Sequence, residues 1–214
     1  MAILDPKMIG IFGGTFDPIH YGHLRSALEV KEIFGLKEVR LIPSAQPPHR
    51  EQPAATTLMR LRMLELAIKN QPGLIIDTRE LNRHGPSYMM DTLKSLRQEC
   101  NGEPLLLFIG SDAFNHLTTW HQWQHLFDYT HIVVMTRPSF EIQDLDDFFK
   151  ARLATGITEL ALNQAGKLYF QQVTQLDISA TAIRNMIAER HNPGFLLPDT
   201  VIAYIRQHKL YQRQ

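Results

Sequence analysis

The segment MIGIFGGTFDPIHYGH, residues 8–23, decides the fold prediction because it joins an apolar run to a glycine-rich turn. Met8 to Phe12 predicts a buried strand, since short aliphatic and β-branched runs that end at glycine are typical of strands. Gly13 and Gly14 follow at once, and glycine permits positive φ and lets bare N–H groups approach an anion. Thr15 adds a hydroxyl donor. The segment therefore predicts a phosphate-binding turn directly after a strand.

Two histidines lie where this turn meets a predicted helix. Asp17-Pro18 turns the chain, and a helix beginning near Tyr21 would point its positive end back toward the glycines. His20 and His23 are three residues apart and would share a face in the first helical turn. An imidazole with an ordinary pKa near 6.5 can carry a proton beside phosphate, whose charge raises that pKa. We expect the pair to stabilise phosphate charge.

Three other interpretations of this segment stay open. A glycine-rich turn is a weak signal alone, a His-x-x-His pair could bind a metal, and either histidine could be structural. No third metal ligand stands at helical spacing, and no His-Glu-x-x-His is present. The Gly-x-Gly-x-x-Gly spacing of dinucleotide-binding dehydrogenases is absent after this strand, and the Gly-Lys-Ser/Thr ending of Walker-type loops is missing.

Length and charge indicate the broad class of protein. The chain has 214 residues, 44% hydrophobic and 21% charged, which suits a single domain over residues 1–214. Lys plus Arg equals Asp plus Glu at 22 each, so no bulk positive field favours a nucleic acid partner. Cys100 is the one cysteine, and the uncharged apolar runs fall far short of the roughly 20 residues that a membrane helix requires. We expect a soluble, cytoplasmic protein without nucleic acid or membrane partners.

Apolar runs alternate with helical patterns along the chain. Strands are predicted at Met8 to Phe12, Glu38 to Pro43, Leu74 to Asp77, Leu105 to Ile109, His131 to Met135 and Leu168 to Phe170. Helical spacing is found at Leu58, Leu61, Leu64 and Ile68, at Tyr88 to Arg97, and at Ile183, Met186 and Ile187. This alternation predicts an α/β fold: a parallel sheet with helices on both faces and ligands beyond the carboxyl ends of the strands. Pro43 to Pro53 and Pro138 to Gly156 resist the pattern and are expected to be surface loops or lids.

A second phosphate-binding element is predicted in ISATAIR, residues 178–184. Ser179 is placed as an N-cap, and its hydroxyl with the free N–H groups of the next turn would bind an anion. Arg184 adds a forked cationic head suited to phosphate. The alternative is an ordinary capped helix with a surface arginine, but its pairing with the first element favours two anchors for a triphosphate.

Seven motifs together resemble a known family. GGTFDPIHYGH (13–23) resembles the signature of the nucleotidyltransferase superfamily with a T/HxGH element, and ISATAIR resembles its ISxTxIR element. The other five resemble, in order and spacing, those of bacterial nicotinate-mononucleotide adenylyltransferase: IPSAQPPHR (42–50), PSY (86–88), GSD (110–112), TW (119–120) and RP (137–138). The resemblance spans essentially the whole chain and implies a Rossmann-like fold of the nucleotidyltransferase type.

The resemblance also implies residue roles. His20 and His23 would contact the ATP phosphates and stabilise the transition state. The remaining ATP-binding residues would be Gly13, Gly14, Thr15, Phe16, His49, Arg50, Gly110, Asp112, Ser179, Thr181 and Arg184, with Gly110 and Asp112 at the ribose. The acceptor would be met by Ser87, Tyr88, Met89, Trp120, His121 and Arg137, with Trp120 stacked on the pyridine ring and amides near Ser87 and Tyr88 on its carboxylate. Such amides favour the acid over the amide, because a carboxamide presents its own donors to them.

Alternatives remain for some of these residues, and three positions depart from the family pattern. Trp120 and Trp123 could be core aromatics, and Asp112 could be a helix N-cap. Ala180 replaces a serine common in the distal motif. Met89 stands where relatives often carry threonine, and His121 where they often carry tyrosine.

The implied reaction is transfer of AMP from ATP to nicotinate mononucleotide, giving deamido-NAD and pyrophosphate by direct in-line attack. Mg²⁺ is expected to accompany ATP, held mainly by phosphates and water because the motifs supply few carboxylates beyond Asp17 and Asp112. No permanent metal site is expected. The alternatives are another acceptor (nicotinamide mononucleotide, phosphopantetheine or a phosphorylated alcohol) and a non-catalytic nucleotide sensor.

Overall fold

Six parallel strands form the centre of the molecule. The computed structural model describes residues 8–47, 52–100, 102–137, 145–174 and 176–212. The strands are β1 (Ile9–Gly14), β2 (Glu38–Pro43), β3 (Leu74–Ile76), β4 (Leu105–Gly110), β5 (His131–Thr136) and β6 (Leu168–Gln172). They lie in the order β3-β2-β1-β4-β5-β6, and every neighbouring pair is parallel. All six strands predicted from the sequence are confirmed, with ends shifted by at most two residues.

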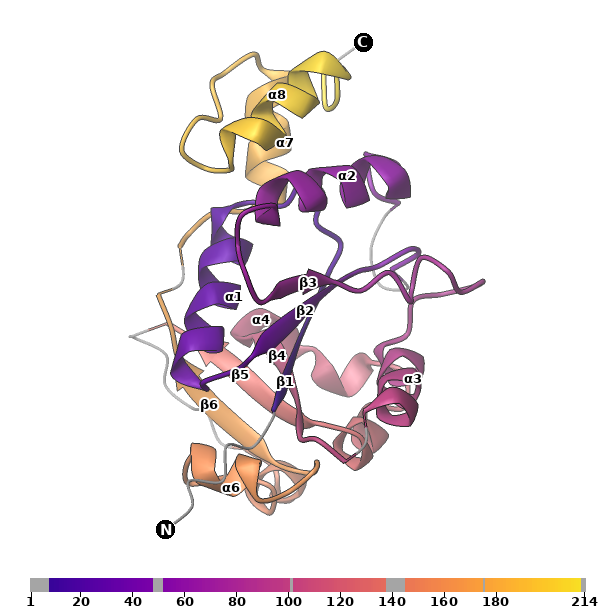
Figure 1. The fold of residues 1–214 in the computed structure, drawn as a ribbon, viewed down its shortest axis with the longest axis vertical. Helices are drawn as coiled ribbons and strands as arrows, with labels where there is room; N and C mark the ends of the chain where they lie inside the picture. Colours follow the sequence, from indigo (N-terminus) through magenta and orange to yellow (C-terminus); the bar gives the residue numbers. More distant parts are fainter. Residues whose placement is uncertain (1–7, 48–51, 101, 138–144, 175, 213–214) are drawn as a thin grey trace.

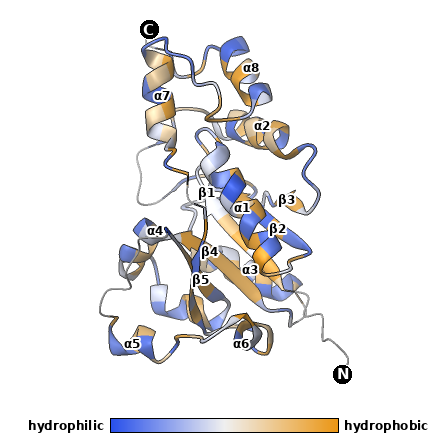
Figure 2. Ribbon diagram, turned by 90° about the vertical axis from the view of Figure 1, so that its left-hand side faces the viewer, coloured by the Kyte–Doolittle hydropathy of each residue, from blue (hydrophilic) through white to orange (hydrophobic). Residues whose placement is uncertain are grey.

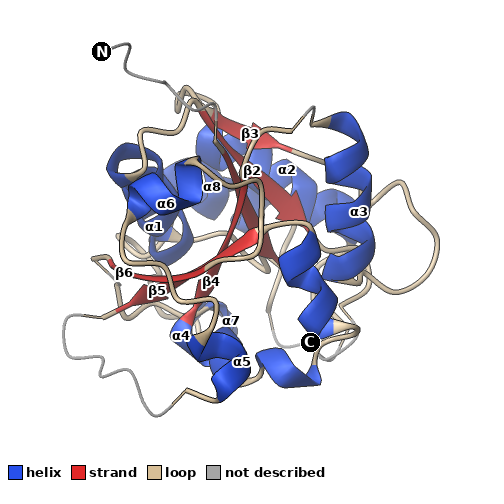
Figure 3. Ribbon diagram, turned by 90° about the horizontal axis from the view of Figure 1, so that it is seen from below, coloured by secondary structure: helices blue, strands red, loops and turns tan. Residues whose placement is uncertain are grey.

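Helices cover both faces of this sheet (Figures 1 and 3). The longer ones are α1 (Tyr21–Ile33), α2 (Thr57–Ile68), α3 (Met89–Glu99), α7 (Ala180–Ala188) and α8 (Asp199–Gln207). The shorter ones are α4 (Ser111–Asn115), α5 (Asp147–Lys150), α6 (Ile157–Ala161) and the 3₁₀ turns η1 (Leu117–Thr119) and η2 (Trp123–Asp128). None of the helices in the described part of the chain has the length and apolar character needed to span a bilayer.

The two faces of the sheet bury separate apolar clusters. Along β4, Leu106 and Phe108 join one cluster, whereas Leu105, Leu107 and Ile109 join the other. This alternation follows from the two-residue period of a strand. The first cluster also takes apolar residues of α1, α2, α7 and α8, and the second takes those of α3, η2 and α5. The apolar strands in the middle of Figure 2 therefore lie between two helical layers, as the sequence predicts.

The strand order has its switch point between β1 and β4. From β1 the chain builds outward through β2 and β3, and from β4 it builds in the opposite direction through β5 and β6. Ligands of open parallel sheets bind in the crevice beyond the strand ends at such a point. The turn after Gly14 and the turn after Gly110 lie there side by side, because β1 and β4 are paired neighbours.

Two predictions about the surface of the molecule are wrong. Leu58 was expected on the buried face of α2, but its side chain is 76% exposed, and Arg60 is buried in its place. The reason is that the Arg60 guanidinium finds hydrogen-bond acceptors beneath the helix. Pro138 to Gly156 was expected to be a loop, yet its described part includes α5, whose Phe149 is buried against the ring of Trp123.

Candidate active site

The two glycines that end β1 stand where a larger side chain would not fit. Neither Gly13 nor Gly14 has the positive φ expected from the sequence; both belong to β1. A Cβ on Gly14 would lie 2.8 Å from the ring of Phe16, and one on Gly13 would lie 2.7 Å from the methyl carbon of Met89. Phe16 itself takes the left-handed backbone conformation, with φ of 50°. The turn is tight because a buried ring and a methionine pack directly against its backbone.

The two histidines lie together at the start of α1. His20 is the N-cap residue of α1, and its ring stacks on that of His23 with centroids 3.7 Å apart and an interplanar angle of 25°. The edge of Phe16 packs on His23 at 5.2 Å. His20 is 4% exposed, and its Nδ1 has no hydrogen-bond partner among the described residues. Both imidazoles can therefore reach one ligand, which confirms the prediction that they adjoin.

Burial sets the protonation state of His20 in the protein alone. It lowers the pKa of His20 to about 4, because the surrounding protein disfavours the imidazolium charge. The sequence-based expectation of a raised pKa depends on the charge of bound phosphate, which opposes this effect. The protein alone thus presents neutral His20.

The distal motif meets the first one at two places. A Cβ on Gly22 would lie 2.9 Å from Nδ1 of His20 and 3.3 Å from the carbonyl oxygen of Ile178, so glycine permits the contact. Arg184 Nη1 donates to the carbonyl oxygen of Asp17 at 2.7 Å, and Nη2 donates to Oγ1 of Thr181 at 3.2 Å. These contacts bring together segments that are 167 positions apart in the sequence.

Helix α7 begins as the sequence predicts. Ser179 is its N-cap, and the Ser179 hydroxyl accepts a hydrogen bond from the amide of Ala182 at 3.1 Å. The amides before Ala182 lack intrahelical partners, as in the first turn of any α-helix, so they can donate to an anion. With Arg184 folded over toward Asp17, the helix N-terminus and the guanidinium belong to the same neighbourhood as the histidine pair.

Asp17 holds several segments of the site in place. Its carboxylate accepts hydrogen bonds from the amides of Ala54 and Ala55 at 2.8 and 3.2 Å and from the hydroxyl of Tyr211 at 2.7 Å. These partners anchor the far end of the proline-rich segment and the end of the chain to the phosphate-binding turn. Both carboxylate oxygens are occupied, so Asp17 is a poor candidate for a metal ligand. No three histidine, cysteine, aspartate or glutamate side chains cluster as a metal site in the described ranges.

Arg60 is a site residue that sequence reasoning missed. It is 1% exposed, and its guanidinium donates to the carbonyl oxygen of Thr15 at 2.7 Å and to Oγ1 of Thr57 at 3.3 Å. Burial lowers the pKa of Arg60, opposed by the nearby charge of Asp17. The only sequence signal was that Arg60 stands four residues before the buried Leu64, on the same face of the helix.

The turn after β4 lies across the switch point from these residues. Gly110 is the N-cap of α4, and Asp112 lies exposed in the first turn of that helix. The alternative of Asp112 as the N-cap is thus wrong. Because β4 pairs with β1, Gly110 and Asp112 are placed at the same edge of the sheet as the glycine-rich turn.

Several residues predicted for the acceptor adjoin one another. The rings of Tyr88 and His121 contact each other with centroids 4.4 Å apart and planes tilted by 31°, and the methyl group of Met89 packs on Gly13. Trp120 is half-buried at the border of the second apolar cluster, so part of its ring packs on the core and part remains exposed to solvent. Ser87 to Met89, which we call the acceptor segment after the role predicted for it, therefore lies directly beside the phosphate-binding turn.

The backbone amides near Ser87 are already engaged. The amide of Ser87 donates to the carbonyl oxygen of Gln46 at 2.9 Å, and that of Tyr88 to Pro86 at 3.0 Å. Met89 and Met90 are the first two residues of α3, where amides have no intrahelical acceptor, and no side chain caps this helix within the described chain. The amide of Asp91 donates to the carbonyl oxygen of Tyr88 at 3.2 Å, so the donors available here are the amides of Met89 and Met90.

Three further residues were predicted for the substrates: His49, Arg50 and Arg137. His49 and Arg50 lie outside the described residues. Arg137 is exposed after β5 and lies 3.4 Å from Asp177, two positions before the distal motif. Its assignment to the acceptor stays a prediction.

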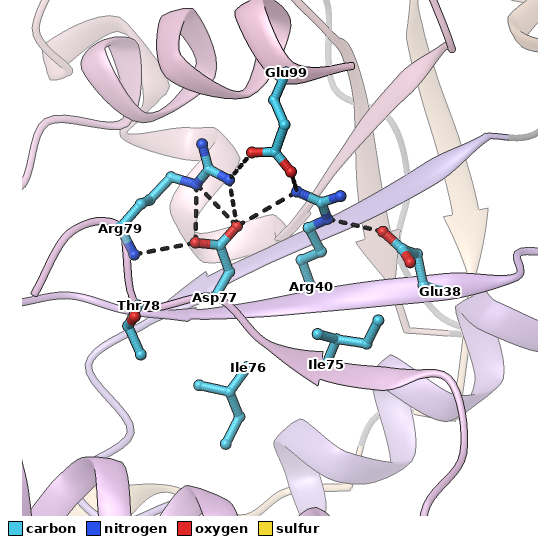
Figure 4. Close-up of a pocket in the computed structure, with 8 residues that line it drawn as sticks. All are labelled: Glu38, Arg40, Ile75, Ile76, Asp77, Thr78, Arg79 and Glu99. Carbon is cyan, nitrogen blue, oxygen red and sulfur yellow. Dashed lines mark hydrogen bonds and ion pairs between the residues drawn. The ribbon is translucent and has the colours of Figure 1, made fainter. Parts of the chain in front are cut away.

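A surface hollow lies elsewhere, at the β3 edge of the sheet (Figure 4). It is lined by Glu38, Arg40, Ile75, Ile76, Asp77, Thr78, Arg79 and Glu99. Arg40 and Arg79 each lie 2.8 Å from the carboxylate of Glu99, and Arg79 lies 2.6 Å from Asp77. These ion pairs tie together β2, the end of β3 and the end of α3.

A parallel sheet with a phosphate-binding turn and two histidines at its switch point is the arrangement of a nucleotidyltransferase. Residues 11–186 match a family model described as cytidylyltransferase-like. The chain is 50% identical over 210 residues to a probable nicotinate-nucleotide adenylyltransferase of Methylococcus capsulatus, covering 96% of this chain and 100% of that protein. It is 45% identical to a Pseudomonas putida protein with the same description, covering 96% and 91%. The chain belongs to the nicotinate-nucleotide adenylyltransferase family.

A solved structure agrees in fold. Plasmodium falciparum nicotinic acid mononucleotide adenylyltransferase complexed with NaAD superposes with a TM-score of 0.72 at 20% identity, covering 96% of this chain and 97% of that one. The nucleotidyltransferase-type fold implied by the sequence motifs is therefore confirmed.

Proposed function

We propose that this protein transfers the adenylyl group of ATP to nicotinate mononucleotide, giving deamido-NAD and pyrophosphate. The observation that carries the proposal is the meeting of the two phosphate-binding segments through Arg184 and Asp17 at 2.7 Å. It brings the Arg184 guanidinium and the start of α7 to the segment that carries the histidine pair, so one triphosphate would meet both. The family relatives, named for the same reaction class, support the choice of acceptor.

The chemical step is a single displacement at the α-phosphorus of ATP. A phosphate oxygen of the mononucleotide forms the new P–O bond, while the bond to pyrophosphate breaks and the leaving group takes the electron pair. The attacking oxygen is already ionised near neutral pH, so no general base is required. Catalysis then consists of positioning and charge stabilisation.

The histidine pair supplies part of that stabilisation. The Nδ1 atom of His20 is buried against Gly22, so we assign the contact with a phosphate oxygen to the other ring nitrogen, Nε2. The accumulated phosphate charge favours the imidazolium form, against the effect of burial. His23, stacked at 3.7 Å, holds the first ring in place and reaches the same charge. Arg184 and the first turn of α7 neutralise the departing pyrophosphate.

The acceptor is recognised by the segment that begins α3. The free amides of Met89 and Met90 suit a carboxylate, because two acceptor oxygens meet two donors. Ser87 fixes the start of this turn, and the ring pair of Tyr88 and His121 provides a flat surface beside it. Trp120 stacks on the pyridine ring at the edge of the second apolar cluster. His49, Arg50 and Arg137 add cationic or polar contacts to the substrates.

Mg²⁺ enters as part of the ATP substrate. The Asp17 carboxylate is saturated by Ala54, Ala55 and Tyr211, so phosphate oxygens and water hold the ion. All of these parts belong to a single catalytic domain over residues 1–214, which acts in the cytoplasm.

The direct test compares acceptors in a pyrophosphate-release assay with ATP and Mg²⁺. Nicotinate mononucleotide should support turnover with a higher kcat/KM than nicotinamide mononucleotide, and phosphopantetheine should support none. Use of phosphopantetheine with nicotinate mononucleotide ignored would overturn the proposed acceptor. ATP binding without turnover on any acceptor would indicate a sensor.

A further inference from the structure

A buried carboxyl group lies under the acceptor segment. Glu80 is in the connection between β3 and α3 and is 4% exposed, although glutamate is almost never fully buried unless it is paired. It touches none of the phosphate-binding residues described above. A buried carboxyl therefore requires hydrogen-bond donors, and the structure places two hydroxyls around it.

The two hydroxyls belong to the beginning of α3. Thr92 is fully buried, and its hydroxyl donates to Oε1 of Glu80 at 2.6 Å. The Ser87 side chain is the second hydroxyl close to this carboxyl. Arg83 adds a positive charge, with Nη2 at 3.3 Å from the carbonyl oxygen of Tyr88 and 3.4 Å from the Thr92 hydroxyl.

Counting donors and acceptors fixes the direction of these bonds. The Ser87 hydroxyl accepts from the amides of Ala45 at 2.9 Å and Gln46 at 3.1 Å, which occupies both of its lone pairs. Its own proton remains available for donation toward the nearby Glu80 carboxyl. A carboxyl that accepts from the buried Thr92 hydroxyl is best served by its ionised, acceptor-only form. Burial raises the pKa of Glu80, while the two hydroxyls and Arg83 oppose that rise.

Glu80 thereby links two parts of the active site. Through the Thr92 hydroxyl it is bonded to the first turns of α3. Beside it, the Ser87 hydroxyl bonds the amides of Ala45 and Gln46 in the segment that follows β2. We propose that Glu80 is a positioning residue that sets affinity for the acceptor nucleotide by locking the start of α3 against the segment after β2. This inference rests on the proposed function, because it takes the start of α3 as the acceptor-binding segment.

The other end of α3 offers a matched control. Glu99 ends the helix and lies 2.8 Å from both Arg40 and Arg79, in the hollow of Figure 4. A change from carboxylate to amide at Glu99 perturbs the same helix by the same chemistry, away from the acceptor segment. A general loss of α3 stability would therefore appear in Glu99→Gln as well.

The test measures KM for each substrate and kcat in Glu80→Gln, Thr92→Val, Thr92→Ser and Glu99→Gln. Glu80→Gln and Thr92→Val should each raise KM for the acceptor about tenfold, with kcat and KM for ATP within about twofold of the parent. Thr92→Ser keeps the hydroxyl and should restore the parent KM, and Glu99→Gln should leave the acceptor KM unchanged. Thr92→Val keeps the test valid if Glu80→Gln does not fold.

The outcomes separate this inference from the proposed function. If the parent protein turns over nicotinate mononucleotide but Glu80→Gln and Thr92→Val keep its acceptor KM, the inference is wrong and the function stands. Equal rises in KM for ATP and acceptor, or the same rise in Glu99→Gln, also overturn it. If the parent itself ignores nicotinate mononucleotide, the proposed function fails.

Discussion

Removing the hydroxyl of Tyr211 tests the contribution of one of the hydrogen bonds that the Asp17 carboxylate accepts. In Tyr211→Phe the ring stays, and only the 2.7 Å hydrogen bond to Oδ1 of Asp17 is lost. A hydrogen bond to a charged group contributes about 1.5–3 kcal/mol. Asp17 keeps its bonds to Ala54 and Ala55, so the lower part of that range applies, about 2 kcal/mol. For a chain of this size that loss corresponds to about 4–8 °C in Tm.

The pH dependence of this loss has a defined sign. Burial and the charge of Asp17 raise the pKa of Tyr211 above its ordinary value. Below about pH 10 the phenol is protonated in both the folded and unfolded states, so its contribution is fully present. Above about pH 10 the unfolded chain releases this proton while the folded chain keeps it, so the contribution declines. The difference in unfolding free energy between parent and Tyr211→Phe should therefore narrow as pH rises from 10.

Urea unfolding followed by circular dichroism at pH 8 and above pH 10 measures both effects. Tyr204→Phe is the control, because Tyr204 lies on α8 in the same region and its ring packs on His208. That variant should change stability by less than about 0.5 kcal/mol. An unfolding free energy of Tyr211→Phe equal to that of the parent at pH 8, or a gap that widens above pH 10, would refute the reasoning.

Three further predictions concern the histidines. His23→Ala should lower kcat by about 10²-fold or more with an intact fold, and unchanged turnover would remove its catalytic role. Gly22→Ala puts a methyl group 2.9 Å from His20 and 3.3 Å from the oxygen of Ile178; kcat should fall at least about tenfold, and parental activity would contradict the close contact. NMR titration of His20 in the protein without ATP should give a pKa of about 4, rising when an ATP analogue binds. Between about pH 6.5 and 4, His20 is then protonated in the unfolded chain and neutral in the folded protein, so the free energy of unfolding should fall as the pH is lowered over that interval. A His20 pKa near 6.5 would contradict its burial.

The sheet could be predicted because its strands are buried on both faces. Such strands form near-continuous apolar runs, as in Leu105 to Ile109, and the runs stand out from their polar surroundings. The starts of α1 and α7 were equally readable, since a turn precedes Tyr21 and Ser179 is a preferred N-cap.

Buried polar residues escaped prediction for a physical reason. An apolar pattern finds residues that avoid water, whereas Arg60 and Glu80 are buried because distant groups satisfy their hydrogen bonds. Their partners, such as Thr15 for Arg60, are fixed only once the chain has folded. Gly13 illustrates the same limit: its sequence suggested a special backbone angle, but the packing of Met89 is what excludes a side chain.

The sequence paired the two phosphate-binding motifs as two anchors for one triphosphate, but residue spacing did not predict the contact through which they meet. Arg184 and Asp17 meet across 167 positions because α7 returns to the switch point of the sheet. No local pattern carries that information. The Arg184 bond to a backbone carbonyl, in place of a free guanidinium, became apparent only in the fold.

The central claim is a direct transfer of AMP to nicotinate mononucleotide, and the configuration at phosphorus tests it most directly. The protein is given ATP made chiral by sulfur at the α-phosphorus, and the configuration of the resulting dinucleotide is determined. A single in-line displacement predicts a deamido-NAD analogue with inverted configuration. Retention of configuration, or failure to form the dinucleotide under conditions where ATP binds, would contradict the account.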